Sequence, residues 1–265
     1  MRIVFIRGAG DVGTAVGIVL RSLGYGVVYS ELPQPTTLRW AVSFSEAVYR
    51  GMWEVAGVKA KRTSSWEEAR ALLEKDFVPI FAPEGRSLQE IAPEILIDAR
   101  MAKRNLGTNI DEAPLVIGLG PGFTAMVDCH AVVETLDGPN LGRALLRGSA
   151  ASPTHRPCEV EGLHEERVIR APCGGLFFPL LTIGDLVEKG KTVARIDGKE
   201  LQAPISGVVR GILHEGLPVR PGMKVVEIDP RKDPQIPFAL ASRSLRIAEG
   251  VVEAISLLRG NAKPL

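Results

Sequence analysis

The fold of the first half of the chain is decided by a stretch near its start, which reads Ile3-Val4-Phe5-Ile6-Arg7-Gly8-Ala9-Gly10-Asp11-Val12-Gly13. The first four of these residues are apolar, as in a short buried strand, and a helical pattern follows the glycines as far as Leu20. A G-x-G-x-x-G loop between a strand and a helix is typical of dinucleotide-binding folds. In such a loop Gly8 permits the tight turn, Gly10 lets the backbone approach a phosphate, and Gly13 lets the helix pack closely. We therefore expect an anion-binding loop at the N-terminus of this helix.

A second strand is predicted over Gly26-Val27-Val28-Tyr29-Ser30, and Glu31 follows it. An acidic residue at this position can accept hydrogen bonds from ribose hydroxyls, so we expect a nucleotide-like ligand. The alternative is that the glycines serve only helix packing and that Glu31 is a solvated strand end. Asp11 also leaves two interpretations open. It repels a phosphate unless a metal ion or a basic group intervenes, or it caps the helix.

The pattern of strands and helices continues along the first half. Strands are predicted at Val78–Ala82 and Ile95–Ile97, and helices at Ser65–Leu73 and Ser87–Ile91. Ser65 and Ser87 are suited to cap the two helices. This alternation predicts an α/β domain over residues 1–150, with a Rossmann-like, mostly parallel sheet and helices on both faces.

A second glycine loop follows the apolar run Leu115-Val116-Ile117. Its candidate cofactor-binding residues are Gly118, Gly120, Gly122, Phe123 and Thr124. Three glycines around a proline favour a rigid turn that exposes backbone N–H groups to an anion. Two such loops at the carboxyl ends of strands in one sheet would converge on one crevice. The alternative is that this second loop is a tight turn without a ligand.

Polar residues that can do chemistry follow this loop. The candidate catalytic residues are Asp128, His130 and Glu134, because carboxylates and imidazole act as acids, bases or ligands. Cys129 lies between them and could be a nucleophile, but strand alternation places it on the other face, where a buried structural cysteine is the simpler interpretation. No zinc motif, P-loop or nucleophile elbow is present, so no metal site is predicted.

An internal repeat organises the second half of the chain. Its two copies align as Ala171-Pro172-Cys173-Gly174-Gly175-Leu176 with Ala203-Pro204-Ile205-Ser206-Gly207-Val208, as Gly184–Gly190 with Gly216–Gly222, and as Val193–Asp197 with Val225–Asp229. One copy is too small to bury its apolar face alone, so we expect the two copies to clasp each other. The pattern over residues 167–230 resembles the biotinyl/lipoyl barrel-sandwich fold.

Carrier domains of that fold present a modified lysine at the hairpin between the copies. The corresponding hairpin here is Asp197-Gly198-Lys199-Glu200, which lacks the usual flanking residues. The module is therefore predicted to be a scaffold, a docking surface or a lid, with Lys199 as a solvated turn residue. A connector over residues 151–166 and a tail over residues 231–265, with a helix at about 244–258, complete the predicted organisation.

Composition narrows the class of partners. The formal net charge of the 265 residues is +1 and aromatic residues make up 5%, so neither nucleic acid nor an anionic membrane is an expected partner. The chain shows no membrane span or signal peptide. Its three cysteines, Cys129, Cys158 and Cys173, form no disulfide framework, which favours a reducing, cytoplasmic location.

Several longer segments carry a resemblance to a known family. They are Glu31–Thr36, Val42–Val48, Asn105–Thr108, Ala113–Ala125, His130–Thr135 and Leu141–Arg143. Over nearly its whole length the chain resembles the selenium-dependent molybdenum hydroxylase system proteins, which are accessory proteins of xanthine-dehydrogenase-like enzymes.

The resemblance implies a role in maturation of molybdenum hydroxylases. The protein would bind a molybdopterin-type cofactor, in a selenium- or sulfur-bearing form, and process it or insert it into an apo molybdenum hydroxylase. Two alternatives stay open from the residues themselves: an NAD(P)-dependent oxidoreductase with an NAD-like cofactor, and a noncatalytic docking scaffold. The sequence does not decide whether the protein is catalytic or whether it forms a homo-oligomer.

Overall fold

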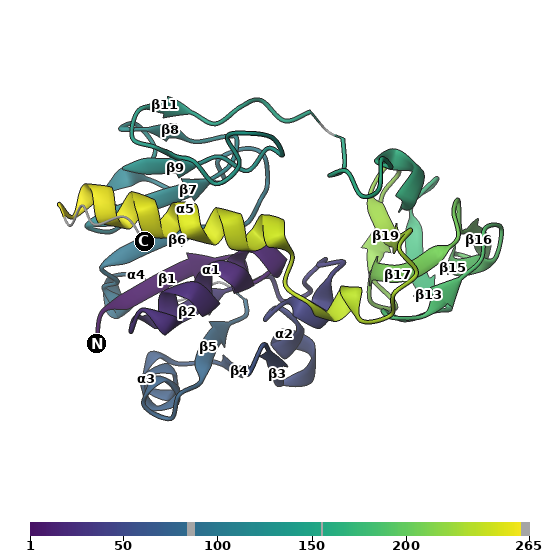
Figure 1. Cartoon of the computed structure of the whole chain (residues 1–265). Coiled ribbons are helices and arrows are strands. Elements are labelled where there is room, and N and C mark those ends of the chain that lie inside the picture. Colours follow the sequence, from purple (N-terminus) through teal and green to yellow (C-terminus); the bar gives the residue numbers. More distant parts are fainter. Residues whose placement is uncertain (84–87, 155, 261–265) are drawn as a thin grey trace. The chain divides into compact units, whose positions relative to one another are not determined.

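The computed structural model describes residues 1–83, 88–154 and 156–260. The chain forms two compact units (Figure 1). The first comprises residues 1–35, 43–153 and 240–265, and the second comprises residues 36–42 and 154–239. The predicted tail therefore divides between the units, because its last part belongs to the first unit and its beginning to the second.

A large sheet forms the centre of the first unit. In the described part of the chain its strand order is β10-β9-β7-β6-β1-β2-β5-β4-β3. The strands are β1 (Ile3–Arg7), β2 (Gly26–Ser30), β3 (Met52–Val55), β4 (Val58–Thr63), β5 (Val78–Phe81), β6 (Ile95–Asp98), β7 (Leu115–Leu119), β9 (Ala131–Val133) and β10 (Ala144–Leu145). All neighbours pair in parallel except β3 with β4 and β10 with β9. The predicted α/β fold with a mostly parallel sheet is confirmed.

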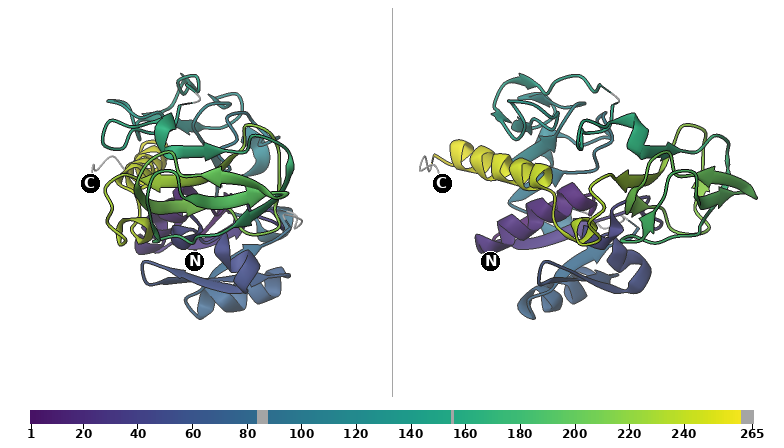
Figure 2. Two further views of the ribbon diagram at one scale, coloured as in Figure 1. Left: turned by 90° about the vertical axis from the view of Figure 1, so that its right-hand side faces the viewer. Right: turned by 45° about the vertical axis from the view of Figure 1, so that its right-hand side comes forward.

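Helices pack on this sheet according to the alternation of its side chains. Tyr29 points to the face that carries α1 (Asp11–Ser22), where its hydroxyl donates to the Gly13 carbonyl oxygen at 2.7 Å. The long helix α5 (Ser242–Leu258) runs beside α1 (Figures 1 and 2). The preceding residue, Val28, points the other way and shares an apolar cluster with Ala69 of α3 (Trp66–Glu74).

The remaining elements of the first unit are short. They are α2 (Glu46–Arg50), α4 (Leu88–Ile91), the 3-10 turn η2 (Ile110–Glu112), and the strands β8 (Thr124–Ala125) and β11 (Gly148–Ser149), which pair with each other. In the described residues of the connections on either side of β6, α4 spans a single turn and η2 has three residues, so these parts hold no long helix of the kind that usually covers a parallel sheet. This leaves room for a groove.

The predicted cap of α3 is confirmed. The Ser65 hydroxyl accepts from the Glu68 backbone N–H at 3.1 Å, while Ser87 lies outside the described residues. We expect Ser65→Ala to lower the free energy of unfolding by about 1 kcal/mol, because one N–H of the first turn loses its partner. Urea unfolding measures this, with Ser65→Asp as the control that keeps an acceptor. Equal losses in the two variants would contradict the assignment of the cap.

The second unit consists of two four-stranded antiparallel sheets in the described part of the chain, seen from one side in the left view of Figure 2. The strands are β12 (Val168–Arg170), β13 (Gly175–Pro179), β14 (Leu186–Val187), β15 (Thr192–Ile196), β16 (Lys199–Gln202), β17 (Gly207–Ile212), β18 (Pro218–Val219) and β19 (Lys224–Asp229). The strands β13, β14 and β15 begin at residues 175, 186 and 192, and β17, β18 and β19 begin at residues 207, 218 and 224. Each pair is offset by 32 residues, as the two copies of the repeat are in the sequence.

The two copies of the repeat exchange strands. One sheet has the order β12-β19-β17-β14 and the other β16-β15-β13-β18, so β14 of the first copy pairs with β17 of the second, and β18 of the second pairs with β13 of the first. Apolar residues of both copies, such as Phe177 and Val209, share one core cluster. Each copy thus completes the sheet of the other, as the small size of one copy requires.

Among the described residues, each helix is too short or too polar to cross a membrane. The turn Asp197-Gly198 between β15 and β16 has positive φ at both residues, 45° and 84°, as a two-residue hairpin requires. Lys199 follows this turn and is exposed, as the sequence predicted.

Candidate functional site

The strand order places a switch point at β1. The chain runs from β1 to β2 and β5 on one side, and then returns to β6 on the other side of β1. In open α/β sheets, ligands bind outside the carboxyl ends of the strands at such a point. The expected place of a ligand site is therefore among the loops and side chains around the carboxyl ends of β1, β2 and β6.

The first glycine loop is tightly packed at this point. Gly8 has a φ of +93°, and a Cβ atom there would lie 2.9 Å from the Ala99 carbonyl oxygen in the loop after β6. A Cβ atom on Gly13 would lie 2.1 Å from the Gly8 carbonyl oxygen, so α1 begins in direct contact with the loop. Gly10 is extended and precedes Asp11, the first residue of α1. These contacts agree with the predicted roles of the tight turn and of close helix packing.

Glu31 holds the glycine loop to the end of β2. One carboxylate oxygen accepts from the Ala9 backbone N–H at 2.7 Å, and the other accepts from the Leu32 N–H at 2.7 Å. The side chain therefore lies beside the loop, where the sequence places it, and its hydrogen bonds within the chain fix the loop conformation.

The second glycine loop is built around packing contacts. Gly120 and Gly122 have φ values of +80° and +106°, and the Gly120 N–H donates to the Val133 carbonyl at 2.9 Å. A Cβ atom on Gly122 would lie 2.4 Å from the Arg104 Cα atom, and one on Gly118 would overlap the ring of Phe123. Phe123 is buried in the core. Close packing explains these residues without a ligand, and a cofactor-binding role for them stays a prediction.

Both predicted catalytic carboxylates have structural partners. Asp128 accepts from the backbone N–H of Thr124 at 2.7 Å and from the Asn105 amide at 3.3 Å. Glu134 is buried and accepts from three backbone N–H groups, those of Thr135, Leu136 and Ala151, at 2.7 to 2.8 Å. Both therefore organise local loops, and their catalytic role stays a prediction.

Cys129 is fully buried in the apolar cluster of this unit, and burial raises the pKa of its thiol to about 11. Its sulfur is therefore protonated at neutral pH, as expected of a structural cysteine. His130 is half-buried, and its Nδ1 accepts from the Val116 N–H at 3.0 Å. This hydrogen bond leaves Nε2 as the ring nitrogen available to other groups.

His130 lines a groove of about 1120 Å³ on the first unit. Its apolar lining includes Phe5 and Phe81, and its polar lining includes Arg7 and Ser30. Arg7 and Ser30 are direct partners at the carboxyl ends of β1 and β2, so their side chains share the face opposite Tyr29 and α1. The groove combines apolar walls with a few convergent polar groups, which is the usual character of a small-molecule site.

Ser30 has an unusual environment. It is 1% exposed, and its hydroxyl has no hydrogen-bond partner within residues 1–83, 88–154 and 156–260. A buried hydroxyl without a partner costs free energy, and native structures contain few of them. Because this residue lines the groove, a ligand that hydrogen-bonds the hydroxyl would remove that cost.

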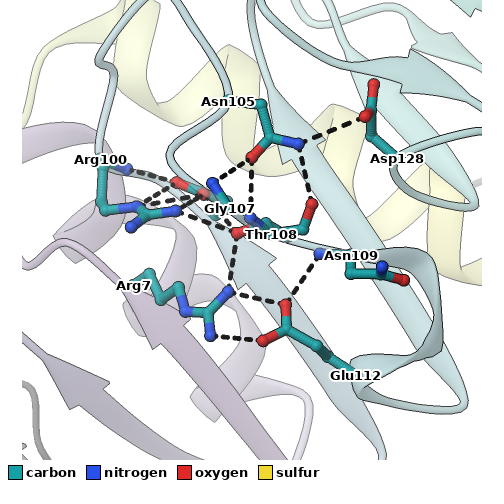
Figure 3. A network of polar contacts seen from close by, with 9 residues as sticks. Arg7, Arg100, Asn105, Gly107, Thr108, Asn109, Glu112 and Asp128 are labelled. Carbon is teal, nitrogen blue, oxygen red and sulfur yellow. Dashed lines mark hydrogen bonds and ion pairs between the residues drawn. The ribbon is translucent and has the colours of Figure 1, made fainter.

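A network of charged groups lies beside the groove (Figure 3). Arg7 forms a two-pronged ion pair with Glu112 at 2.8 Å and donates to the Thr108 hydroxyl at 2.7 Å. The same hydroxyl accepts from Arg100 and donates to the buried Asp98 carboxylate at 2.7 Å. Burial raises the pKa of the Glu112 carboxyl, but the hydrogen bonds from Arg7 and from the Asn109 N–H outweigh it, so this pKa lies below its usual value.

Of the residues that line this groove, the sequence analysis gave only His130 as a candidate site residue. Arg7 and Ser30 are the polar residues that end two buried strands, and that position is the signal that could have identified them. Asn109 and Glu112 also line the groove, but they come from an irregular connection whose path the sequence does not reveal. Within the described parts of the chain, no group of three or more His, Cys, Asp or Glu residues has the arrangement of a metal site.

Comparison with known proteins gives one relative of high similarity. The chain is 41% identical over 258 residues to the uncharacterized protein YqeB of Escherichia coli strain K12. The matched region covers 97% of this chain and 48% of YqeB. The chain thus spans about half the length of this relative. No protein-family model matches the chain.

Two solved structures show faint similarity. An aspartoacylase family protein from Mesorhizobium loti is 11% identical with a TM-score of 0.25, covering 76% of this chain and 55% of that one. The ectoine utilization protein EutE (DoeB) from Ruegeria pomeroyi is 14% identical with a TM-score of 0.25, covering 85% and 57%. Similarity at this level supports no statement about this chain.

Proposed function

We propose that the groove of the first unit binds a molybdopterin-type cofactor or a related nucleotide, and that the protein serves the maturation of molybdenum hydroxylases in the cytoplasm. The observation that carries the proposal is the buried Ser30 hydroxyl, which has no partner among the described residues and lines an amphipathic groove at the switch point. The identity of the ligand rests on the family resemblance of the sequence.

The groups around the groove suit such a ligand chemically. A pterin is a flat ring system with hydrogen-bonding edges and a phosphate on its side chain. Phe5 and Phe81 can contact the faces of the ring, while Ser30 and His130 can meet its polar edge. Arg7, which lines the groove and pairs with Glu112, supplies a guanidinium group for a phosphate. The cofactor is cargo in this proposal, since its metal chemistry belongs to the hydroxylase that receives it.

The second unit would act as a docking scaffold for the apo-hydroxylase. We propose that its two strand-exchanging copies form a barrel-sandwich module of the biotinyl/lipoyl kind, and the sheet orders support this. Lys199 lies at the tight hairpin without the flanking residues of a carrier lysine, so this module would hold a partner rather than carry a group.

Native mass spectrometry tests the ligand directly. The full chain is purified from a host that makes molybdenum cofactor and is sprayed without denaturation. We expect an added mass equal to a pterin or its dinucleotide form. A retained nicotinamide nucleotide would instead support the oxidoreductase alternative, and a protein without any added mass would contradict cofactor binding.

Ser30→Ala separates binding from stability. Removal of a buried hydroxyl without a partner should leave the free energy of unfolding unchanged or slightly higher, whereas affinity for the ligand should fall about 5- to 30-fold through loss of one hydrogen bond. The measurements are urea unfolding and titration with the isolated cofactor. Ser22→Ala, on the exposed end of α1, is the control for both. Unchanged affinity in Ser30→Ala would rule out the groove as the site.

A further inference from the structure

The lining of the groove in the first unit combines a rigid part and a short irregular part. Arg7 and Ser30 end β1 and β2, which pair in the middle of the sheet. Residues 109–114 also line the groove, all six of them in a row. In this fully described stretch regular structure is limited to the three-residue turn η2. A short connection opens at a lower cost than a central strand, so residues 109–114 are the part of the lining that can give way to a ligand.

The Glu112 carboxylate reaches from this connection to Arg7 (Figure 3). Its Oε2 accepts from Nη1 of Arg7 and its Oε1 accepts from Nη2, both at 2.8 Å. A guanidinium group binds a phosphate through the same two-pronged geometry. Glu112 therefore occupies the place on Arg7 that an anionic group of a ligand would take.

The two members of this ion pair are held differently. The Arg7 side chain is 11% exposed, and it also donates to the hydroxyl of Thr108, which donates to the buried Asp98 of β6. The Glu112 side chain is 25% exposed, and it also accepts from the Asn109 N–H within its own short connection. Glu112 can therefore turn towards solvent while Arg7 keeps its position.

Ser30 gives a reason for such an exchange. It is the pairing partner of Arg7 in the parallel register, so the two side chains share one face of the sheet. The Glu112 carboxylate does not serve the Ser30 hydroxyl, which has no hydrogen-bond partner within the described residues. A phosphate group carries more charge than a carboxylate and has three accepting oxygens. It can bind Arg7 with two oxygens and accept from Ser30 with the third.

We propose that Glu112 is a specificity-determining residue, whose carboxylate occupies a phosphate subsite of the groove and is displaced when a phosphate or pyrophosphate group binds Arg7 and Ser30. The inference rests on the proposed function only in taking the groove as a ligand site. A monocarboxylate would replace Glu112 by an equivalent group and would lose its own freedom of motion on binding. The site therefore favours phosphorylated ligands over carboxylates.

Two further carboxylates line the groove, and one of them provides a matched control. Glu94 is paired with Arg259 at 2.8 Å. Asp111 is exposed and lies next to Glu112 on η2, and its carboxylate forms no ion pair within the described part of the chain. Asp111→Asn removes the same charge from the groove as Glu112→Gln, but it leaves Arg7 paired.

Calorimetric titration of the full chain with inorganic pyrophosphate tests the proposal. We expect Glu112→Gln to bind pyrophosphate about 10-fold more tightly than the unmodified chain, because a neutral amide competes for Arg7 more weakly than a carboxylate. Asp111→Asn should gain less than about 3-fold, since an exposed charge acts through solvent. Equal gains in the two variants, or no gain in Glu112→Gln, would overturn the proposal. Binding of acetate as tight as that of pyrophosphate would overturn it as well.

Hydrogen exchange of the unmodified chain gives an answer that needs no variant and holds if Glu112→Gln fails to fold. The Asn109 N–H donates at 2.9 Å to Oε2 of Glu112, the oxygen that also binds Nη1 of Arg7. Displacement of Glu112 by pyrophosphate should therefore speed the exchange of the Asn109 amide, measured by NMR. Exchange that is unchanged or slower with saturating pyrophosphate would overturn the proposal.

These experiments and native mass spectrometry fail independently. Faster exchange at Asn109 in a chain that retains no pterin would support the phosphate subsite and contradict only the cofactor. A retained pterin, together with equal pyrophosphate affinity in the unmodified chain and in Glu112→Gln, would support the cofactor and overturn the displacement of Glu112.

Discussion

Asp98→Asn is expected to lower the free energy of unfolding by about 2 to 3 kcal/mol, because it removes one charge from a largely buried ion pair. The Asp98 side chain is 3% exposed and that of Arg100 is 20% exposed. The carboxylate accepts from the Arg100 side chain and backbone and from the Thr108 hydroxyl. Asparagine keeps the shape of the side chain, but it leaves the charge of Arg100 without its partner.

The loss should be concentrated in the loop after β6. The Thr108 hydroxyl connects Asp98, Arg7 and Arg100, so hydrogen exchange of backbone amides should accelerate over residues 99–109 (Figure 3). The matched control is Asp76→Asn, since Asp76 also pairs with an arginine but is 91% exposed. It should cost less than about 0.5 kcal/mol. If the two variants lose the same stability in urea, the network does not hold this loop.

The elements of the first half could be predicted because their signals are local. The strand β2 has the predicted bounds, and the glycine loop follows β1 as expected. The hairpin of β3 and β4 was missed. Most of its residues, such as Lys59 and Lys61, are exposed, and the strands lie at the sheet edge, so the sequence shows no long apolar run.

The strand order and the groove could not be predicted in the same way. The strand β6 pairs with β1 on the side opposite β2, and this pairing joins segments that are distant in the sequence. It places His130 in the same groove as Arg7 and Ser30. The sequence pointed to acidic residues around His130, yet Glu134 uses its carboxylate for three backbone N–H groups. A carboxylate next to a loop in sequence can accept from the backbone N–H groups of that loop, and the sequence does not distinguish this role from that of a reactive group.

In the second unit the strands could be predicted from the sequence, but the contacts between their charged side chains could not. Its period predicted the corresponding strands of the second unit, because turn glycines and alternating apolar residues recur in each copy. The ion pairs of Glu227 have no such signal, since they involve Arg210 at a β-bulge and Arg167, which precedes β12. A bulge depends on the pairing register of two strands, which a single sequence does not reveal.

Gly13→Ala is expected to destabilise the first unit by at least about 2 kcal/mol, contrary to helix propensity. Gly13 lies in the first turn of α1, where alanine would ordinarily gain about 1 kcal/mol over glycine. The new Cβ atom, however, would lie 2.1 Å from the Gly8 carbonyl oxygen. No rotation of an alanine side chain relieves that overlap, so either α1 or the glycine loop must move.

This displacement would also disturb the proposed ligand site, because Gly8 directly follows Arg7 and its N–H donates to the carbonyl oxygen of Ser30 at 2.9 Å, and both Arg7 and Ser30 line the groove. The affinity for the cofactor should therefore fall together with the stability, whereas Ser30→Ala should lower the affinity alone. Ser22→Ala in the exposed last turn of the same helix is the control, and it should gain a few tenths of a kcal/mol. Urea unfolding and cofactor titration of the three variants make the comparison. A Gly13→Ala protein as stable as Ser22→Ala would show that the loop and the helix are not in contact.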